Sequence, residues 1–419
     1  MSPHSINKNL CIQDALIVTQ NKKREVFYGS ILIENGMIKK ISKNSRIQTP
    51  AHTKTIRAKG LVILPGFVQT HVHLCQTLFR NLADDLELLD WLSKKIWPYE
   101  AAHTENSLYI STLLGIQELL SSGTTCILDM ATVHHTEAVF EAVQETGIRA
   151  NIGKCLMDHP RTTPKGLRQN TAQALKEAQR LFTKWHGKKN DRIRASYAPR
   201  FAISCTHELL ARVAEISQEQ GAIVHTHANE NLKEIVLVKK MTGKDNFKYL
   251  YDLGLCSKRL VVAHGVWLKK SEIELIKKTK SNITHCPSSN LKLASGIAPI
   301  PTLIKKGINV SLGADGAPCN NNLNMFQEMR LAALIHKPFH GPMAMNAQQA
   351  LDMATLNGAR ALGWDDQIGS IEVGKKADLI GLNLNHPECL TPSHQPKNVV
   401  TAIVYSGQPS HVQWSMVDG

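Results

Sequence analysis

The sequence predicts an α/β protein built on a (β/α)₈ barrel, and three observations lead to this class. Short apolar segments alternate with helix-like segments over most of the chain, and eight such segments lie between residues 61 and 318. Near-continuous apolar runs are typical of parallel strands buried on both faces. The length of 419 residues accommodates one barrel of roughly 250 residues plus a smaller domain. An open, doubly wound sheet is the structural alternative.

The expected strands follow one another at regular intervals. They are the segment that carries His71, then residues 124–130, 148–158, 192–200, 222–230, 259–268, 282–290 and 308–318. The expected helical segments between them are residues 86–102, 104–123, 136–147, 171–187, 206–221, 232–243, 246–254, 270–280 and 299–307. Residues 104–123 end on glycine, as a helix C-terminus should. Two more helices, 324–337 and 346–363, follow the eighth strand.

Both ends of the chain fall outside this alternation. Residues 11–20 and 29–43 have the pattern of short, hairpin-like strands, and residues 368–384 and 398–419 read similarly. We therefore expect a small β-sandwich made from residues 1–62 and 368–419, beside a barrel of residues 63–367.

The composition is that of an ordinary globular protein, with 42% hydrophobic and 20% charged residues. No leader-like N-terminus and no run of 18 apolar residues occurs, so we expect a cytoplasmic protein without a membrane span. The nine cysteines are scattered without a C-x-x-C pair, which predicts reduced thiols. The net charge of +14 comes from dispersed lysines rather than one basic stripe, so we expect no nucleic-acid partner.

Polar residues gather where the expected strands end. His71 and His73 end the first strand, His227 the fifth, His264 the sixth, and Asp315 the eighth. A pair of histidines such as His71 and His73 is often a hydrogen-bonded core feature, and so is a lone one. Active sites of (β/α)₈ barrels lie at these carboxyl ends, and imidazoles with a carboxylate are what Zn²⁺ or Fe²⁺ prefers. The pattern therefore predicts a metal site.

Several motifs resemble the amidohydrolase superfamily. They are "ILPGFVQTHVH", "HANEN", "AHG", "HCPSSNLKLASGIAPI", "LGADGAPCNNNLNMFQEMR", "MATLNGARALG" and "IGSIEVGKKADLI". Within that superfamily the chain is similar to the branch of S-adenosylhomocysteine, 5′-methylthioadenosine and 5′-deoxyadenosine deaminases, guanine deaminases and triazine hydrolases. Such relatives usually continue beyond "MVDG" through another strand and a tail, which leaves open whether the small domain is complete.

The resemblance implies a role for each polar residue. It implies that one divalent ion, Zn²⁺ or alternatively Fe²⁺, is bound by His71, His73, His227 and Asp315. Glu230 would be the proton shuttle, and His264 would hold the hydrolytic water, which together with Asp315 makes it catalytic. His225 is the alternative ligand on the fifth strand, but His227 keeps the three-residue spacing to Glu230.

A second metal ion would need a bridging ligand, such as a carboxylated lysine at a strand end. The fourth strand offers Arg200, which cannot serve, and the third offers Lys154, for which a salt-bridging or substrate-facing role is the alternative. We therefore expect a mononuclear site.

The substrate is less sharply indicated. The segment "WPYE" resembles one that presents a carboxylate to a ribose diol, which implies that Glu100 binds substrate. The segment "APRFAISCT" is instead more like that of guanine deaminases, with Arg200 facing a ring carbonyl or nitrogen. His285 either touches the substrate or makes a structural hydrogen bond. Glu230 would also contact the substrate ring.

We therefore expect a metal-dependent deaminase of an adenosine-type nucleoside, which releases ammonia after attack by a metal-bound hydroxide. A guanine deaminase or a triazine-type hydrolase is the alternative. A non-enzymatic scaffold is disfavoured, because a binding role would not need every ligand and Glu230. The expected partner is a small molecule, with a homo-oligomer possible.

Overall fold

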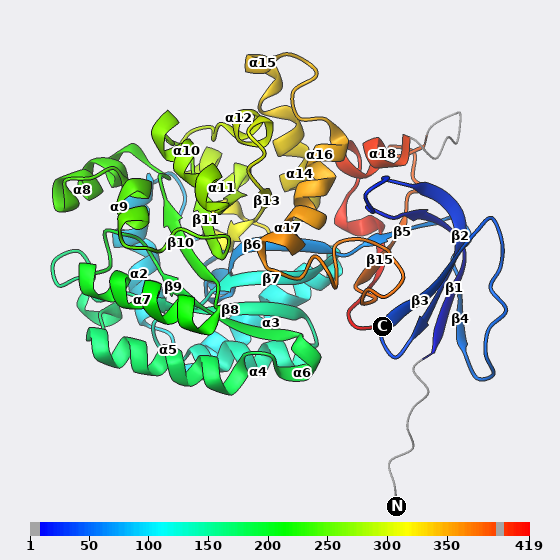
Figure 1. Cartoon of the computed structure of the whole chain (residues 1–419), viewed down its shortest axis with the longest axis horizontal. Helices are drawn as coiled ribbons and strands as arrows, with labels where there is room; N and C mark the ends of the chain where they lie inside the picture. Colours follow the sequence, from blue (N-terminus) through cyan, green and yellow to red (C-terminus); the bar gives the residue numbers. More distant parts are fainter. Residues whose placement is uncertain (1–8, 391–397) are drawn as a thin grey trace, which may run out of the picture.

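The computed structural model describes residues 9–390 and 398–419. Its larger part is a curled parallel sheet surrounded by helices, and its smaller part is a mixed sheet built from both ends of the chain (Figure 1). The α/β class predicted from the sequence is confirmed.

The parallel sheet contains each of the eight strands that the sequence predicts. Its strands are β6 (Phe67–His73), β7 (Thr124–Met130), β8 (Arg149–Leu156), β9 (Ile193–Pro199), β10 (Val224–Ala228), β11 (Leu260–His264), β12 (Asn282–His285), β13 (Val310–Leu312) and β14 (Asp315–Gly316). The order is β13-β12-β11-β10-β9-β8-β7-β6-β14. Since β13 and β14 belong to one short segment, which pairs with β12 on one side and β6 on the other, the sheet curls around on itself.

Helices precede the strands in the predicted alternation. Those before β13 are α1 (Leu88–Trp91), α2 (Trp97–Ala101), α3 (Glu105–Ser121), α4 (Thr136–Thr146), α5 (Thr171–Trp185), α6 (Lys188–Asp191), α7 (His207–Gln220), α8 (Leu232–Thr242), α9 (Asn246–Asp252), α10 (Lys270–Thr279), α11 (Pro287–Lys292) and α12 (Ile300–Lys305). Those after it are α13 (Ala317–Asn320), α14 (Met325–Leu334), α15 (Lys337–His340), α16 (Ala347–Ala354), α17 (Leu356–Ala361) and α18 (Val399–Tyr405). The 3₁₀ helices include η1 (Leu74–Phe79), η3 (Lys165–Leu167) and η5 (Pro409–His411).

The end signals of the helices act as the sequence suggests. The Thr104 side chain accepts a hydrogen bond from the Ser107 amide at the start of α3, and Gly123 just beyond its end has a φ of +88°. The expected helix over residues 86–102 is interrupted: a π-helical segment, η2 (Leu92–Ile96), lies between α1 and α2. Such segments often occur at functional sites.

The mixed sheet joins the two ends of the chain. Its strands are β1 (Leu10–Val18), β2 (Val26–Glu34), β3 (Met37–Lys43), β4 (Lys54–Arg57), β5 (Leu61–Pro65), β15 (Leu379–Asn383) and β16 (Val412–Met416). Hydrogen-bond ladders join all seven strands into one mixed sheet, ordered β16-β15-β5-β1-β2-β3 with β4 on β1. The reason is that β1 pairs with β4 along its first half and with β5 along its second half.

The strand pattern expected over residues 398–419 is wrong for its first half. This stretch forms α18 before it reaches β16. Val399, Val400, Ile403 and Val404 are the buried residues of α18, a spacing that places them on one helical face. The β-branched composition suggested a strand, but packing of this face against α14 and α16 decides the conformation.

A buried ion pair holds the two sheets together. The Arg149 guanidinium on β8 donates to Asp378 through Nε at 2.7 Å and Nη2 at 3.0 Å, and neither residue is more than 3% exposed. The chain crosses between the sheets at Gly66, where a side chain would collide with Thr125, because an added Cβ would lie 2.1 Å from its Oγ1.

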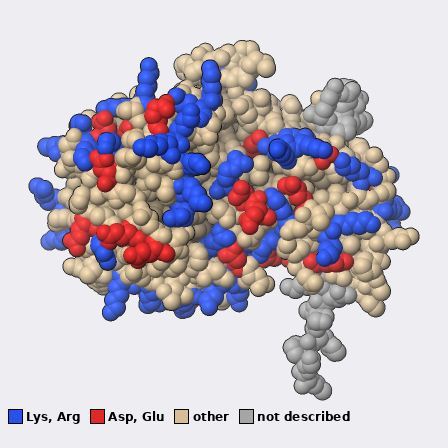
Figure 2. Space-filling view, viewed as in Figure 1, with Lys and Arg blue, Asp and Glu red and all other residues tan. Residues whose placement is uncertain are grey.

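Charged side chains cover the surface in a dispersed way. On the face shown in Figure 2, Lys and Arg are spread over both parts of the molecule, with Asp and Glu between them. Among the described residues, no helix is both long and apolar enough to cross a membrane.

Candidate metal centre

The predicted ligands meet at the carboxyl-terminal end of the parallel sheet. His71 and His73 lie on β6, His227 on β10, His264 at the end of β11, and Asp315 on β14. None of these five residues is more than 5% exposed. Residues far apart in the sequence thus share one buried space, because parallel strands all end on the same side.

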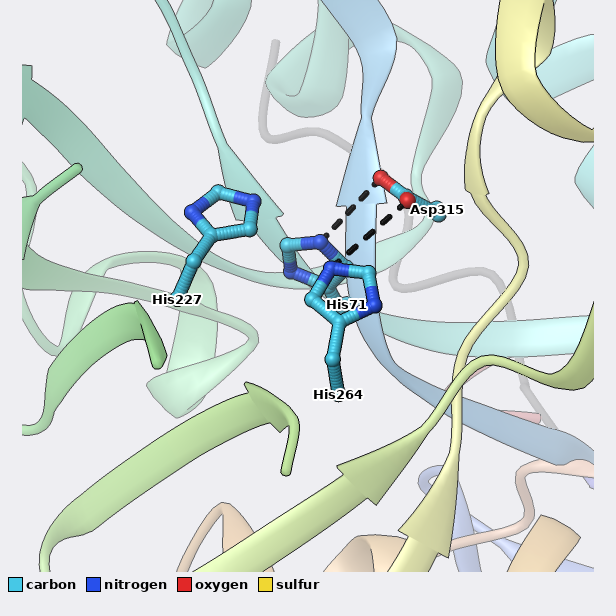
Figure 3. Close-up of side chains that lie close together, drawn as sticks. All are labelled: His71, His227, His264 and Asp315. Carbon is cyan, nitrogen blue, oxygen red and sulfur yellow. Dashed lines mark ion pairs between the residues drawn. The ribbon is translucent and has the colours of Figure 1, made fainter. Parts of the chain in front are cut away.

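The side chains converge closely (Figure 3). Asp315 Oδ1 lies 3.2 Å from His71 Nε2 and 3.4 Å from His73 Nε2, and the Nε2 atoms of His73 and His227 are 3.3 Å apart. One set of possible ligand atoms, from His71, His227, His264 and Asp315, lies within 4.8 Å of one another. This set includes His264 where we expected His73.

The far edge of each imidazole ring is held by a partner, which aims Nε2 into the shared space. The Nδ1 atoms of His71, His73, His227 and His264 lie 2.8–2.9 Å from His225 Nε2, Met130 O, Arg200 O and Asn290 Oδ1 respectively. Hydrogen bonds of this kind fix the tautomer of metal-binding histidines. His225 therefore lies behind His71, on the side away from the shared space.

The charges of the site are arranged for a cation. Burial holds the pKa of His73 and of His227 well below the ordinary value, with His71 adding to the effect. Burial also lowers the pKa of His264 to about 4. For Asp315 burial acts in the opposite direction, but the neighbouring imidazoles, His71 first, outweigh it and leave the pKa well below its usual range. The site thus favours the neutral form of the His73, His227 and His264 imidazoles and the ionised form of the Asp315 carboxyl group.

Two ligand candidates have strained backbones. His264 has a φ of +73° and Asp315 a φ of +64°, both in the left-handed region. Such conformations persist where the surrounding structure enforces them, and they cluster at functional sites. Ser289 holds the Asp315 carboxylate by donating from Oγ to Oδ2 at 2.6 Å.

The residues fit a divalent metal ion. Nε2 of His71 and Nε2 of His264 are buried atoms without a hydrogen-bond partner, and Oε2 of Glu230 is a third. An unpartnered buried polar atom is costly, so an ion at His71 together with a water molecule beside His264 and Glu230 would give all three atoms a partner. Imidazole nitrogens and a carboxylate are suitable donors for Zn²⁺ or Fe²⁺.

Glu230 stands beside this centre as a buried carboxyl group. Its Oε2 lies 3.5 Å from His264 Nε2, and its backbone N–H donates to Glu234 Oε2 at 2.8 Å. Burial raises the pKa of Glu230 well above its ordinary value, and the Asp315 charge raises it further. A carboxyl group with a raised pKa is suited to exchange protons near neutral pH.

Glu100 and Arg200 form a buried pair next to the centre. Arg200 Nη2 donates to Glu100 Oε1 at 3.2 Å, Arg200 Nη1 donates to Oε2 at 2.5 Å, and Gln76 Nε2 donates to Oε1 at 2.8 Å. Glu100 is 4% exposed and Arg200 1%. Arg200 Nε is buried without a partner.

Two other predicted residues lie outside the cluster of ligands. Both ring nitrogens of His285 are buried without a hydrogen-bond partner, and its ring faces His336 at a centroid distance of 5.8 Å. Lys154 donates from Nζ to Val133 O at 2.8 Å and to Gln169 Oε1 at 2.7 Å. Lys154 is thus occupied by structural hydrogen bonds.

The cavity at the centre is small, about 10 Å³. It is lined by His73, Gln76, Leu88, Trp91, Leu92, Arg200, Phe201, His227, Glu230, His264, Leu293 and Asp315, which do not include Glu100 or His285. Leu88 and Trp91 of α1 and Leu92 of η2 form the apolar part of its lining next to the polar groups. A larger cavity of about 1100 Å³ lies at the opposite end of the strands, near Ile223, Arg259 and Ser281, far from this chemistry.

Three functional candidates were not assigned from the sequence. Ser289 and Asn290 hold Asp315 and His264, and Gln76 holds Glu100. Ser289 and Asn290 lie inside the quoted motif "HCPSSNLKL", which was the available signal. Nothing in the order of residues indicated that Gln76 would reach Glu100.

Known proteins match nearly the whole chain. The family described as "Amidohydrolase family" matches residues 62–419. The 5′-deoxyadenosine deaminase of Methanosarcina acetivorans is 37% identical over 98% of this chain and 92% of its own length. The 5-methylthioadenosine/S-adenosylhomocysteine deaminase of Caldanaerobacter subterraneus is 36% identical over 98% and 92%. The crystal structure of an adenosine deaminase from Xanthomonas campestris with bound zinc superposes with a TM-score of 0.90 at 31% identity, covering 98% of this chain and 92% of that one.

Proposed function

Because the chain belongs to the amidohydrolase family, whose members hydrolyse C–N bonds, we propose that it is a metal-dependent deaminase of an adenosine-type nucleoside. The observation that carries the proposal is the buried centre of histidines and Asp315 with Glu230 beside it. The named relatives act on 5′-deoxyadenosine, 5-methylthioadenosine or S-adenosylhomocysteine, and each is similar to this chain over nearly its whole length. Compounds of this class are the proposed substrates.

The architecture that supports this function is a (β/α)₈ barrel with a small domain. We assign the curled sheet to that barrel, with β13 and β14 together as its eighth strand, because one edge of this segment pairs with β12 and the other with β6. We assign residues 63–367 to the barrel domain and residues 9–62, 368–390 and 398–419 to the small domain, while residues 1–8 and 391–397, which the sequence-based boundaries also included, lie outside the described residues.

The proposed ligands are His71, His73, His227 and Asp315, and the proposed ion is Zn²⁺. His264 is excluded from the ligands, because its Nε2 lies 3.5 Å from Glu230, which suits a group that positions the reacting water. A bound divalent ion supplies Lewis acidity and lowers the pKa of a water ligand from 15.7 to about 7. The Lys154 side chain already donates to Val133 O and Gln169 Oε1, so it is not free to become the carboxylated bridging ligand that a second ion would need. This supports a single ion.

The chain's own residues carry the proton. Glu230, in its anionic form, accepts a proton from the attacking water and passes it to a nitrogen of the purine ring. This transfer makes the amino-bearing carbon electrophilic. Asp315 and His264 hold the water in position while its oxygen bonds to the amino-bearing carbon. The remaining hydroxyl proton then moves to the amino group, and the C–N bond breaks to give the keto purine and ammonia. The buried site keeps bulk water away from these charges.

Glu100 is the proposed ribose-binding group. Its carboxylate already accepts from Arg200 and Gln76, yet two oxygens offer about four acceptor sites in all. Arg200 donates twice and Gln76 once, so about one acceptor site is left for a ribose hydroxyl, and a second hydroxyl can bind only if Gln76 or one Arg200 N–H releases its site. Arg200 and Gln76 line the cavity and separate Glu100 from it, so their movement must accompany binding.

Guanine deamination is a second candidate, favoured by one observation. Arg200 lines the cavity, and its Nε has no hydrogen-bond partner, so this N–H is available for a purine ring carbonyl or nitrogen. His285 is proposed as a further substrate contact in either case, because its two ring nitrogens lack partners.

Metal removal tests the proposal. Protein stripped by a chelator should lose ammonia release from 5′-deoxyadenosine, and addition of one equivalent of Zn²⁺ should restore it. Stripped protein that still turns over, or zinc-loaded protein inactive on every aminopurine, would contradict the proposal. Turnover confined to aminotriazines or chlorotriazines would favour the triazine hydrolases.

A further inference from the structure

The larger cavity lies at the end of the parallel sheet opposite the candidate metal centre. Its volume is about 1100 Å³, and its lining includes Arg259, Asn282 and Asn309, which lie at or just before the starts of β11, β12 and β13. Ligand cavities in proteins usually have volumes of about 300–1000 Å³. The cavity can therefore hold a molecule of the size of a nucleotide, and deamination at the other end of the strands gives it no role.

Most of the cations that line this cavity have no acidic partner. Lys306 pairs with Glu274, and Arg194 pairs with Asp191. Among the described residues, no carboxylate lies at ion-pair distance from the other lining cations, which are Lys258, Arg259, Lys277, Lys280 and Arg360. The lining therefore attracts an anion.

The acidic side chains of the lining offset little of this charge. Asp191 is already neutralised by Arg194, and Asp352 pairs with Arg24, which lies outside the lining. Asp365 is the remaining lining carboxylate.

Helix ends account for some of the cations but not for all of them. Lys277, Lys280 and Arg360 lie in or just after the last turns of α10 and α17, where a cation offsets the negative end of the helix dipole. Lys258 and Arg259 instead come just before the strand β11. The half-buried Arg259 guanidinium donates no hydrogen bond within the described residues, so its N–H groups are available to a phosphate.

The buried part of the lining suits an aromatic base. Ile223, Ile276 and Ile308 provide an apolar wall, and each is at most 8% exposed. Asn151 on β8 also lines the cavity, is 1% exposed, and has an Oδ1 atom without a hydrogen-bond partner. The last torsion of an asparagine side chain has a broad energy well, so the amide can turn towards a ligand. It can then both donate to and accept from the edge of a base, which would satisfy the buried oxygen.

We propose that this cavity binds a nucleotide, with its phosphate groups at Lys258, Arg259 and Arg360 and its base beside Asn151. Arginine binds a phosphate through two parallel hydrogen bonds, and lysine contributes a point charge. The site is separate from the metal centre, and the proposal does not depend on the proposed deaminase activity.

Equilibrium dialysis with ATP tests the proposal at roughly 0.15 M salt, where long-range attraction between charges is screened. The wild type should bind one equivalent of ATP, and Arg259→Gln and Arg360→Gln should each weaken binding by about tenfold. The double variant Lys39→Gln, Lys40→Gln, at exposed lysines of β3, loses as much charge as both arginine changes together and should bind ATP as the wild type does. Circular dichroism verifies that each variant is folded.

Inorganic triphosphate separates the two parts of the ligand. It should bind more weakly than ATP, because it has no base, and Asn151→Leu should weaken the binding of ATP but not that of triphosphate. Triphosphate that binds as tightly as ATP would overturn the assignment of a nucleotide. So would the absence of ATP binding, or ATP binding that responds equally to the arginine variants and to the lysine control.

Discussion

Arg200 and Glu100 form a bidentate ion pair beside the candidate metal centre. Nη1 lies 2.5 Å from Oε2 and Nη2 lies 3.2 Å from Oε1, and both side chains are at most 2% exposed. The sequence suggests Glu100 and Arg200 as alternative substrate contacts. The structure makes them one unit, so a change to either alters the other. Their contributions to binding therefore have to be measured together.

The first prediction concerns this pair. Glu100→Gln should destabilise the fold by about 3–5 kcal/mol, because it leaves the Arg200 charge buried without its partner. The double variant Glu100→Gln, Arg200→Met should recover a large part of that loss. Urea unfolding of the wild type, both single variants and the double variant measures the coupling. If the changes in unfolding free energy of the two single variants add up to that of the double variant, the ion pair contributes nothing to stability.

The second prediction separates ligands from the neighbouring histidine. His73→Gln should lose the barrel metal, whereas His264→Gln should keep it and lose turnover, because His264 is assigned to the reacting water. Metal analysis of both purified proteins decides between the two histidines. If the His73→Gln protein keeps the metal and the His264→Gln protein loses it, the proposed ligand set is wrong. The ligands would then be His71, His227, His264 and Asp315, whose possible ligand atoms lie within 4.8 Å of one another.

The third prediction concerns the proton shuttle. Glu230→Gln should retain the metal ion, since Glu230 is not a proposed ligand, while kcat falls by about 10²- to 10⁴-fold. Steady-state kinetics on metal-loaded protein measures this. Glu219→Gln, at an exposed position on α7, is the matched control and should leave kcat unchanged. Near-normal turnover of Glu230→Gln would exclude the assigned role.

The fourth prediction is a pH dependence of stability that Glu328 produces. Burial raises the pKa of Glu328 to about 7, although hydrogen bonds from Ser288 and Asn320 act against the increase. In the unfolded chain the value is about 4.3, so the folded state holds more protons between these limits, and stability falls as pH rises from about 4.3 to 7. The whole effect amounts to roughly 4 kcal/mol, of which roughly 3 kcal/mol falls between pH 5 and pH 8.

Glu328→Gln should remove this contribution. The free energy of unfolding of the variant, relative to wild type, should therefore rise between pH 5 and pH 8 by up to roughly 3 kcal/mol. Denaturant unfolding at a series of pH values measures the difference. Parallel pH curves for the two proteins would show that Glu328 has an ordinary pKa.

The fold was largely predictable because its signals are local. Apolar strands such as β7 and β8, and glycine-terminated helices such as α3, follow directly from residue type and spacing. The helix α18 was not predictable, since its β-branched residues favour a strand and only packing against α14 and α16 makes it helical. The single mixed sheet likewise depends on long-range pairing.

The candidate centre was predictable to a similar degree. His71, His227 and Asp315 come together because parallel strands end on one side, which the sequence pattern already implied. The relation between Glu100 and Arg200 depends on how a helix before the second strand packs against the end of the fourth, and residue order contains no signal for that. The same holds for the position of His264 among the possible ligands.

The central claim is deamination of an adenosine-type nucleoside, and one comparison of kcat/KM tests it most directly. Zinc-loaded wild-type protein should deaminate 5′-deoxyadenosine and 5′-methylthioadenosine with a much higher kcat/KM than guanine, because Glu100 would be left without the ribose hydroxyls when a free base binds. A clear preference for guanine would contradict the account and assign the substrate contact to Arg200.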